Sequence, residues 1–164
     1  MNANIQIRPL TSAEIPFLAE MLYTALFVRP GDAPFPKEII RRPKLAKYIK
    51  NWGSYSFDQA IVAASGDQLV GAVWGRLFSV EHPGYGFIDE RTPEITIAIK
   101  PAFRGQAIGT LLLQAIEIPY QELGVTALSL SVDQLSPAIP LYLRCGYQIH
   151  AEEGTAYTMR KAIS

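Results

Sequence analysis

The chain has few of the residues from which metal and disulfide sites are built. Its single cysteine, Cys145, excludes an internal disulfide and a cysteine-rich metal site. Only two histidines occur in the 164 residues, so a histidine-based zinc site is also disfavoured and we expect no metal. No nearby His or Asp suggests that Cys145 is an activated nucleophile, and we expect a small buried side chain there.

The chain also has no excess of charge of either sign and no long apolar run. Lys and Arg together number 15, as do Asp and Glu, so the formal net charge is zero and favours neither a nucleic acid nor an anionic membrane as partner. No segment is apolar enough to span a bilayer, and no leader peptide is apparent at the N-terminus. We therefore expect a single domain over residues 1–164, in the cytoplasm, as a monomer or homodimer.

What is present is a regular alternation of strand and helix patterns. Apolar periodicity predicts the element order β-α-α-β-β-β-α-β-α-β-β, a mixed α/β domain. The strands are expected over residues 5–8, 60–64, 69–78, 94–99, 128–132, 147–150 and 156–160. Helices are expected over residues 15–26, 37–51 and 137–144, and from residue 108 to Pro119, which should kink or end that helix. The helix over 37–51 is expected to break near Pro43. Strands 94–99 and 128–132, joined through a helix, should run parallel.

Residues 104–110, Arg-Gly-Gln-Ala-Ile-Gly-Thr, form the most informative segment. They lie between a predicted strand and a predicted helix, where turn N–H groups and the helix dipole together favour an anion. A P-loop would need a lysine where Thr110 stands, and a dinucleotide fold would need Gly-x-Gly-x-x-Gly early in the chain; neither pattern is present. The pyrophosphate of coenzyme A fits the segment best.

Two motifs carry a resemblance to a known family. The first motif is Arg/Gln-x-x-Gly-x-Gly/Ala, which Arg104, Ala107 and Gly109 match with alanine in place of the first glycine. The second motif is Asn-Pro-Ala-x-x-Leu-Tyr-x-x-x-Gly-Phe/Tyr, which residues 136–147 match with Ser136 in place of the asparagine. The chain thus resembles the GNAT superfamily of N-acetyltransferases over nearly its whole length. The resemblance implies a mostly antiparallel, twisted sheet of about six or seven strands with about four helices, splayed where the cofactor binds.

The resemblance also implies which residues bind acetyl-CoA, the expected acyl donor. Ile97 and Ile99 should pair with the pantetheine arm, and residues 104–110 should hold the pyrophosphate. The full expected set is Ile97, Ala98, Ile99, Arg104, Gly105, Gln106, Ala107, Ile108, Gly109, Thr110, Ser136 and Tyr142. We expect Ala107 to be tolerated with φ below zero, because residues near a helix start commonly have such values.

Direct transfer of an acetyl group to an amine needs an acid and a base. Tyr142 matches the family's proton donor for the departing thiolate, and the Ile99 N–H is the expected partner of the thioester oxygen. Glu94, at the start of the splayed strand, is the expected base. Four loop residues are alternatives to it: Glu81, His82, Asp89 and Glu90. The structural alternative is that Tyr142 only packs and that Glu94 only ends a strand.

Three functions follow from these motifs. The first is acetyl-CoA-dependent N-acetylation of a primary amine, either a small molecule or a protein N-terminus or lysine. The second is a non-catalytic acyl-CoA-binding or regulatory domain, and the third is an interaction domain without a cofactor. Residues 27–50 and 81–93 carry no recognisable motif, and we expect them to select the acceptor.

Overall fold

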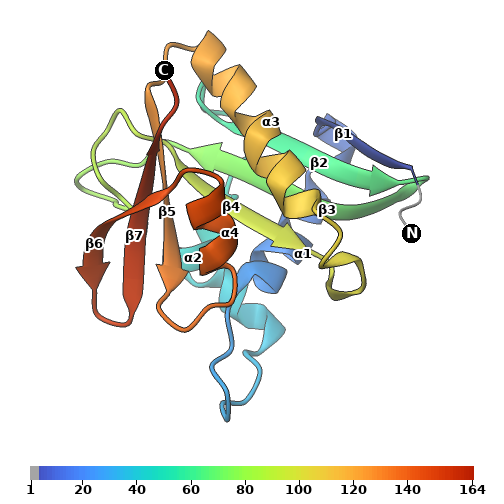
Figure 1. Cartoon of the computed structure of the whole chain (residues 1–164), viewed down its shortest axis with the longest axis horizontal. Coiled ribbons are helices and arrows are strands. Elements are labelled where there is room, and N and C mark those ends of the chain that lie inside the picture. The colour runs from blue at the N-terminus through green and yellow to red at the C-terminus, as the bar shows by residue number, and fades with distance from the viewer. Residues whose placement is uncertain (1–3) are drawn as a thin grey trace.

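The computed structural model describes residues 4–164, and within them seven strands form one sheet (Figure 1). The strands are β1 (Ile5–Pro9), β2 (Gln59–Ser65), β3 (Gln68–Arg76), β4 (Glu94–Ile99), β5 (Ala127–Asp133), β6 (Gln148–Glu153) and β7 (Ala156–Ala162). Their order is β1-β2-β3-β4-β5-β7-β6, and every neighbouring pair is antiparallel except β4 and β5. The predicted mixed fold and the parallel pair are confirmed.

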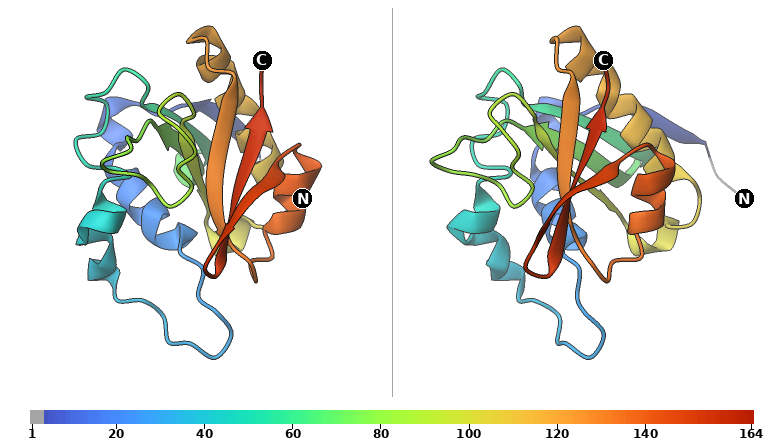
Figure 2. Two further views of the ribbon diagram at one scale, coloured as in Figure 1. Left: turned by 90° about the vertical axis from the view of Figure 1, so that its left-hand side faces the viewer. Right: turned by 60° about the vertical axis from the view of Figure 1, so that its left-hand side comes forward.

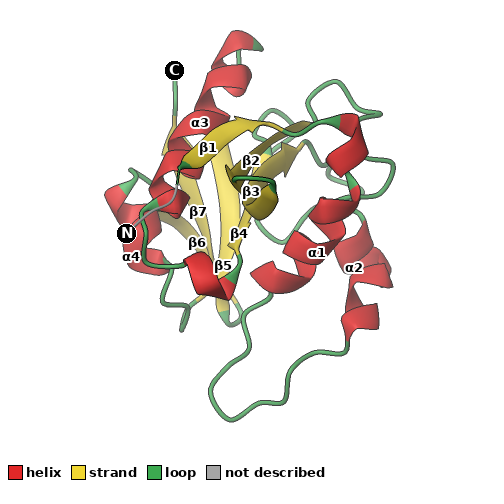
Figure 3. Ribbon diagram, turned by 90° about the vertical axis from the view of Figure 1, so that its right-hand side faces the viewer, coloured by secondary structure: helices red, strands yellow, loops and turns green. Residues whose placement is uncertain are grey.

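Helices cover both faces of this sheet (Figures 2 and 3). One face carries α1 (Pro16–Ala25) and α2 (Pro43–Ala46), and the other carries α3 (Ile108–Glu122) and α4 (Ile139–Arg144). The segment between α1 and α2 extends away from the sheet in every view of Figures 1 to 3. Each face therefore has its own hydrophobic core, one beneath α1 and one beneath α3.

The alternation of β4 divides its side chains between these two cores. Ile95, Ile97 and Ile99 belong to the core beneath α3, whereas Ala98 belongs to the core beneath α1. Successive side chains of a strand point to opposite faces, so Glu94 lies on the same face as Ala98. The strand thereby presents its carboxylate to the α1 side and its apolar row to the α3 side.

The sheet opens in its centre, between β4 and β5. These strands share a single paired position, Glu94 opposite Ser129, fixed by a 3.0 Å hydrogen bond from the Ser129 N–H to the Pro93 carbonyl. At the far end of β4, the Lys100 N–H donates to Val70 at the β3 side over 2.8 Å. Backbone groups of alternate residues point to opposite edges of a strand. The N–H and C=O groups of Ile97 and Ile99 therefore face the opening.

Two helical segments differ from the prediction. Residues 37–51 form a 3-10 turn (Lys37–Arg41) and the short α2, because Pro43 holds Arg42 extended, with ψ at 141°. The expected break at Pro43 is confirmed, but the helix does not continue to residue 51. In contrast, of the two outcomes predicted at Pro119, a kink or an end, the structure contradicts the end. Helix α3 runs to Glu122, and the Leu123 N–H donates to the Pro119 carbonyl at 3.2 Å. Proline removes only one donor there, and the packing of the fully buried Tyr120 holds the last turn.

Candidate active site

A cavity of about 860 Å³ lies in the opening between β4 and β5. The start of α3 and the α4 segment line it on one side, and the end of α1, Leu45, Tyr48 and Tyr85 line it on the other. Among the predicted site residues, those that line the cavity are Glu94, Ile97, Ala98, Ile99, Arg104, Gly105, Ala107, Ile108, Gly109, Thr110, Ser136 and Tyr142. Gln106 is the one predicted residue that does not. The two predicted motifs, distant in sequence, therefore border one space.

The N-terminus of α3 supplies an anion site to this cavity. The first hydrogen bond inside the helix runs from the Leu111 N–H to the Ala107 carbonyl at 3.3 Å. The N–H groups of Ile108, Gly109 and Thr110 precede that bond, so they have no partner within the helix and lie at the positive end of its dipole. These donors fit the phosphates of a nucleotide-type cofactor.

Ala107 turns the chain into that helix in a left-handed conformation. Its φ is +65° and its ψ is 11°, so the expectation of a negative φ is wrong. Gly105, two residues earlier, also has a positive φ, of +74°. The left-handed conformation costs a residue with a Cβ roughly 1–2 kcal/mol. A strained residue at a ligand-binding turn is typical of sites where backbone N–H groups are aimed at a ligand.

Arg104 and Ser136 contact the backbone rather than each other. The Arg104 Nε donates to the Ile99 carbonyl at 3.2 Å, so the exposed guanidinium folds back over the end of β4. The Ser136 Oγ accepts a hydrogen bond from the Ala138 N–H at 3.1 Å, just before α4. Ser136, which stands where the matching motif has asparagine, thus fixes the start of the α4 segment.

Glu94 is a buried carboxylate whose Oε1 makes no hydrogen bond within the described residues. Its Oε2 accepts a 2.7 Å hydrogen bond from the Tyr48 hydroxyl, which in turn accepts the Tyr85 N–H at 2.7 Å. Gly84 lies against the carboxylate so closely that a methyl group there would overlap Oε1. A buried polar atom left without a partner at a cavity wall is available to a ligand.

Burial raises the pKa of Glu94 to about 7. The Tyr48 hydroxyl, the Gly86 backbone amide and the positive charge of Lys47 act in the opposite direction and favour the carboxylate. The carboxyl group is therefore close to half ionised at neutral pH, which is the condition under which a general base works best.

Tyr142 projects from α4 into the same cavity. Burial raises its pKa to about 12, so the phenol keeps its proton at every physiological pH. Its ring meets the buried ring of Tyr147 edge-on, with the centroids 6.3 Å apart. The cavity thus brings together a half-ionised carboxylate, a protonated phenol and a helix N-terminus.

Comparisons with known proteins account for this combination. Residues 23–147 match the model of the acetyltransferase (GNAT) family. The chain belongs to the GNAT family. No functionally curated protein matches the sequence at a significant level. The family membership therefore rests on the family model and on the shared architecture.

Solved GNAT structures superpose on nearly the whole chain. The PaiA N-acetyltransferase of Thermoplasma acidophilum, solved with coenzyme A, has a TM-score of 0.70 at 18% identity and covers 97% of this chain and 99% of its own. YncA of Salmonella typhimurium, solved with acetyl-CoA, has a TM-score of 0.65 at 17% identity, and the match covers 99% of this chain and 95% of YncA. The ribosomal-protein-alanine N-acetyltransferase of Brucella melitensis has a TM-score of 0.65 at 19% identity, and the match covers 96% of this chain and 99% of that protein. At these identities the likeness establishes the GNAT fold.

The alternative bases lie outside the GNAT cavity. Glu81, His82, Asp89 and Glu90 are exposed in the loop between β3 and β4, and none lines the cavity. Asp89 accepts hydrogen bonds from the Arg91 N–H and the Thr92 hydroxyl, both at 2.9 Å, so it shapes its own loop. Glu90 accepts the Val80 N–H at 2.9 Å.

Sequence reasoning missed Tyr48, the hydrogen-bond partner of Glu94. Tyr48 comes 46 positions earlier, in a segment without a motif, so no local spacing connects the two residues. One signal was available in Gly84 and Gly86, because paired glycines in a loop mark close backbone approach. Cys145 is half-buried against the core beneath α3 rather than fully buried.

The described part of the chain holds no group of three or more side chains that could ligate a metal ion. Within residues 4–164, no helix has both the length and the apolar character needed to cross a bilayer.

Proposed function

We propose that the chain, as one GNAT domain over residues 1–164, transfers the acetyl group of acetyl-CoA directly to a primary amine. The observation that carries this proposal is Glu94, a residue that lines the cavity between β4 and β5 and whose buried carboxylate has no hydrogen-bond partner on Oε1 within the described residues. A domain that only bound acyl-CoA would have no use for an unpaired buried carboxylate, which costs folding free energy.

The donor occupies the α3 side of the cavity in this proposal. The N–H groups at the start of α3, together with the turn at Gly105 and Ala107, hold the pyrophosphate. The pantetheine arm lies along β4 and pairs with the backbone groups of Ile97 and the N–H of Ile99 that face the opening, as a peptide adds to a sheet edge. The Ile99 N–H then donates to the thioester oxygen.

Glu94 removes the proton that keeps the amine from reacting. A primary ammonium has a pKa of about 10, so most of it is charged at neutral pH. The carboxylate of Glu94 attracts the ammonium into the cavity and accepts its proton, either directly or through one water. The neutral nitrogen attacks the thioester carbon, the C–N bond forms, and the C–S bond breaks to release the thiolate.

Tyr142 stabilises the departing thiolate. With a pKa of about 12, the phenol is about 3.5 units less acidic than a thiol of pKa about 8.5, so full proton transfer would be uphill by roughly 5 kcal/mol. A hydrogen bond from the neutral phenol to sulfur avoids that cost and still lowers the barrier. The nitrogen loses a second proton as the amide forms, and that proton neutralises the thiolate through solvent. The proton held by Glu94 passes to solvent and restores the carboxylate.

Two measurements test the proposal. Acetyl-CoA should raise the midpoint of thermal unfolding, whereas ATP and NAD should not, because only the former fits both the α3 terminus and the β4 edge. Thiol release should then follow when a panel of primary amines is added. An equal response to all three nucleotides would remove the cofactor assignment, and thiol release no faster than without amine would leave a binding domain.

The Tyr142→Phe variant tests the role of the phenol. We expect turnover with a productive amine to fall by about 10- to 100-fold, because the hydrogen bond to sulfur is lost. Tyr147→Phe is the matched control, since the Tyr147 hydroxyl is buried without a partner and does not line the cavity. Full activity of Tyr142→Phe would show that Tyr142 only packs. A cytoplasmic location, where acetyl-CoA is available, completes the proposal.

A further inference from the structure

The α1 side of the cavity is lined mainly by apolar side chains. These are Leu22, Ala25, Leu26, Phe27, Val28 and Leu45. Leu26, Phe27 and Val28 contribute to neither hydrophobic core, although they follow directly after α1. Three consecutive apolar residues that border a cavity without packing into a core offer apolar contact to something that enters it.

Negative charge on this side is restricted to one available group. Glu94 and Asp133 are the acidic residues that line the cavity. Both carboxylate oxygens of Asp133 accept hydrogen bonds from Arg29, Oδ2 from its Nε and Oδ1 from its Nη2, each at 3.0 Å. Oδ1 also accepts the Leu135 N–H at 2.8 Å. Arg29 therefore neutralises Asp133, and among the described residues that line the cavity Glu94 is the carboxylate left to pair with an ammonium.

Lys47, directly after α2, is a fixed cation that does not line the cavity. The Lys47 ammonium donates to the Pro83 carbonyl and lies 5.8 Å from the Phe78 ring centre and 6.0 Å from that of Tyr85. Burial raises the pKa of Glu94, and the charge of Lys47 opposes this only as the smallest of the contributions that favour the carboxylate. A second ammonium on a ligand bound at Glu94 would lie against the apolar wall of the cavity, which is unfavourable.

From this distribution we propose that the acceptor is a small primary monoamine whose amino group is joined to one apolar group and to no second charge. The proposal rests on the acetyl transfer proposed above. The amine meets Glu94 and Tyr48, and its apolar group lies against Leu26, Phe27 and Leu45. Arg29 joins the segment after α1 to the end of β5, so a bridge crosses the space that a protein chain would need. That bridge favours a small molecule.

A matched pair of amines tests the charge requirement. n-Butylamine and 1,4-diaminobutane share one reacting end and differ in whether the other end is a methyl group or an ammonium. With acetyl-CoA saturating, we expect kcat/KM for n-butylamine to exceed that for the diamine by at least about 100-fold, and 2-phenylethylamine to exceed n-butylamine. Equal values, a preference for the diamine, or a peptide with a free N-terminus outcompeting both would overturn the inference.

A binding measurement separates this inference from the acetyl transfer on which it rests. The thermal midpoint of the protein saturated with CoA is measured with each amine in turn. A larger rise with 2-phenylethylamine and n-butylamine than with 1,4-diaminobutane supports the apolar monoamine, even in a protein that releases no thiol. An equal or reversed order overturns it, even if acetyl transfer to other amines is observed.

A charge substitution at Phe27 tests the placement of the apolar group. Phe27→Glu adds a carboxylate to the wall, and we expect the diamine-to-butylamine ratio of kcat/KM to rise by at least about tenfold. Phe27→Leu is the matched control and should keep the original ratio. Val28→Glu, at a more exposed position of the same wall, is the second variant if Phe27→Glu fails to fold. An unchanged ratio in the folded glutamate variant would overturn the placement.

Discussion

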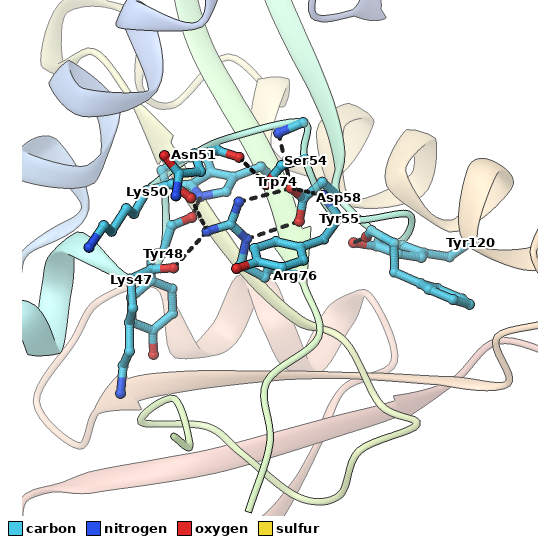
Figure 4. A network of polar contacts seen from close by, with 12 residues as sticks. Lys47, Tyr48, Lys50, Asn51, Ser54, Tyr55, Asp58, Trp74, Arg76 and Tyr120 are labelled. Carbon is cyan, nitrogen blue, oxygen red and sulfur yellow. Dashed lines mark hydrogen bonds and ion pairs between the residues drawn. The ribbon is translucent and has the colours of Figure 1, made fainter. Parts of the chain in front are cut away.

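Arg76 and Glu94 are buried charges at neighbouring positions of the sheet, paired across β3 and β4, but their surroundings differ completely. Arg76 is 4% exposed, and all three of its nitrogens are bonded (Figure 4). Asp58 binds it at 2.9 and 2.8 Å, and the Lys47 and Lys50 carbonyls accept at 2.9 and 2.7 Å. Glu94 is 3% exposed and has one oxygen without a partner.

The difference separates a charge that builds the structure from one that is available for chemistry. Arg76 ties the segment between α2 and β2 to β3, and the rings of Trp52 and Tyr55 lie 5.0 Å from its guanidinium. The same segment carries Tyr48, whose carbonyl accepts the Trp74 Nε1 at 3.2 Å and whose hydroxyl binds Glu94. The satisfied charge thus holds the residue that orients the unsatisfied one.

Removing the carboxylate of Glu94 should have the largest effect on activity. We expect Glu94→Gln to lower kcat/KM by about 10²- to 10⁴-fold, the usual contribution of a general base. The thermal midpoint should stay equal or rise, because the amide carries no buried charge. Glu90→Gln, in the exposed loop, is the control and should retain activity. Near-normal activity of Glu94→Gln would mean that Glu94, like Arg76, serves only the structure.

Removing the partner of Arg76 should instead affect stability. We expect Asp58→Ala to lower the free energy of unfolding by about 3–5 kcal/mol, because it leaves a buried guanidinium uncompensated. Denaturant unfolding measures this, with Asp67→Ala in the exposed β2–β3 turn as the control. A loss below about 1 kcal/mol would place the Arg76 pair in the same class as a surface ion pair.

Stability should depend on pH through Glu94. Its pKa is about 7 in the folded state and about 4.5 when unfolded, so folding favours the protonated form. Stability from this group is present below pH 4.5 and is lost as the pH rises to about 7, by roughly 3 kcal/mol in total. Denaturant unfolding between pH 5 and pH 8 should show the wild type losing more stability than Glu94→Gln. Parallel losses in both proteins would contradict the raised pKa.

The smallest of these effects is expected at Tyr48, a positioning residue. Tyr48→Phe removes the hydrogen bond that favours the ionised carboxylate, so the pKa of Glu94 should rise above about 7. The rising limb of the kcat/KM profile should move to higher pH by about one unit, with about a tenfold loss at neutral pH. Tyr55→Phe is the matched control from the same segment. A lower kcat/KM with an unshifted profile would mean that Tyr48 serves only packing.

Sequence patterns anticipated most of the fold because its elements are locally encoded. The observed bounds of β4, Glu94–Ile99, are those predicted from its alternating pattern. The turn at residues 104–110, between a strand and a helix, lies at the cavity as expected. The errors lie where tertiary packing decides. Pro119 stays within α3 because the packing of Tyr120 outweighs one lost donor, and Ala107 adopts a left-handed conformation that its side chain alone disfavours.

The two halves of the site differ in how far they could be predicted. The proposed donor half consists of backbone groups and a local motif, so Ile99, Gly109 and Tyr142 could be placed at the cavity by pattern. The proposed acceptor half consists of side chains of α1, the α2 segment and the β3–β4 loop, which meet only in the folded chain. Tyr48 and the apolar residues around Phe27 have no fixed spacing from Glu94, and therefore no pattern could join them.

The single pair between β4 and β5 also has a mechanical consequence. The four strands β1 to β4 form one half-sheet and β5 to β7 the other, and Ser129 fastens both, through its N–H to the Pro93 carbonyl and its Oγ to the Gly86 carbonyl at 2.7 Å. Arg29 bridges the opposite end to Asp133. The two half-sheets are thus joined by the hydrogen bonds of Ser129 at one end of the opening and by the Arg29–Asp133 ion pair at the other. A donor bound along Ile97 and Ile99 would fill the gap between β4 and β5 as an additional strand.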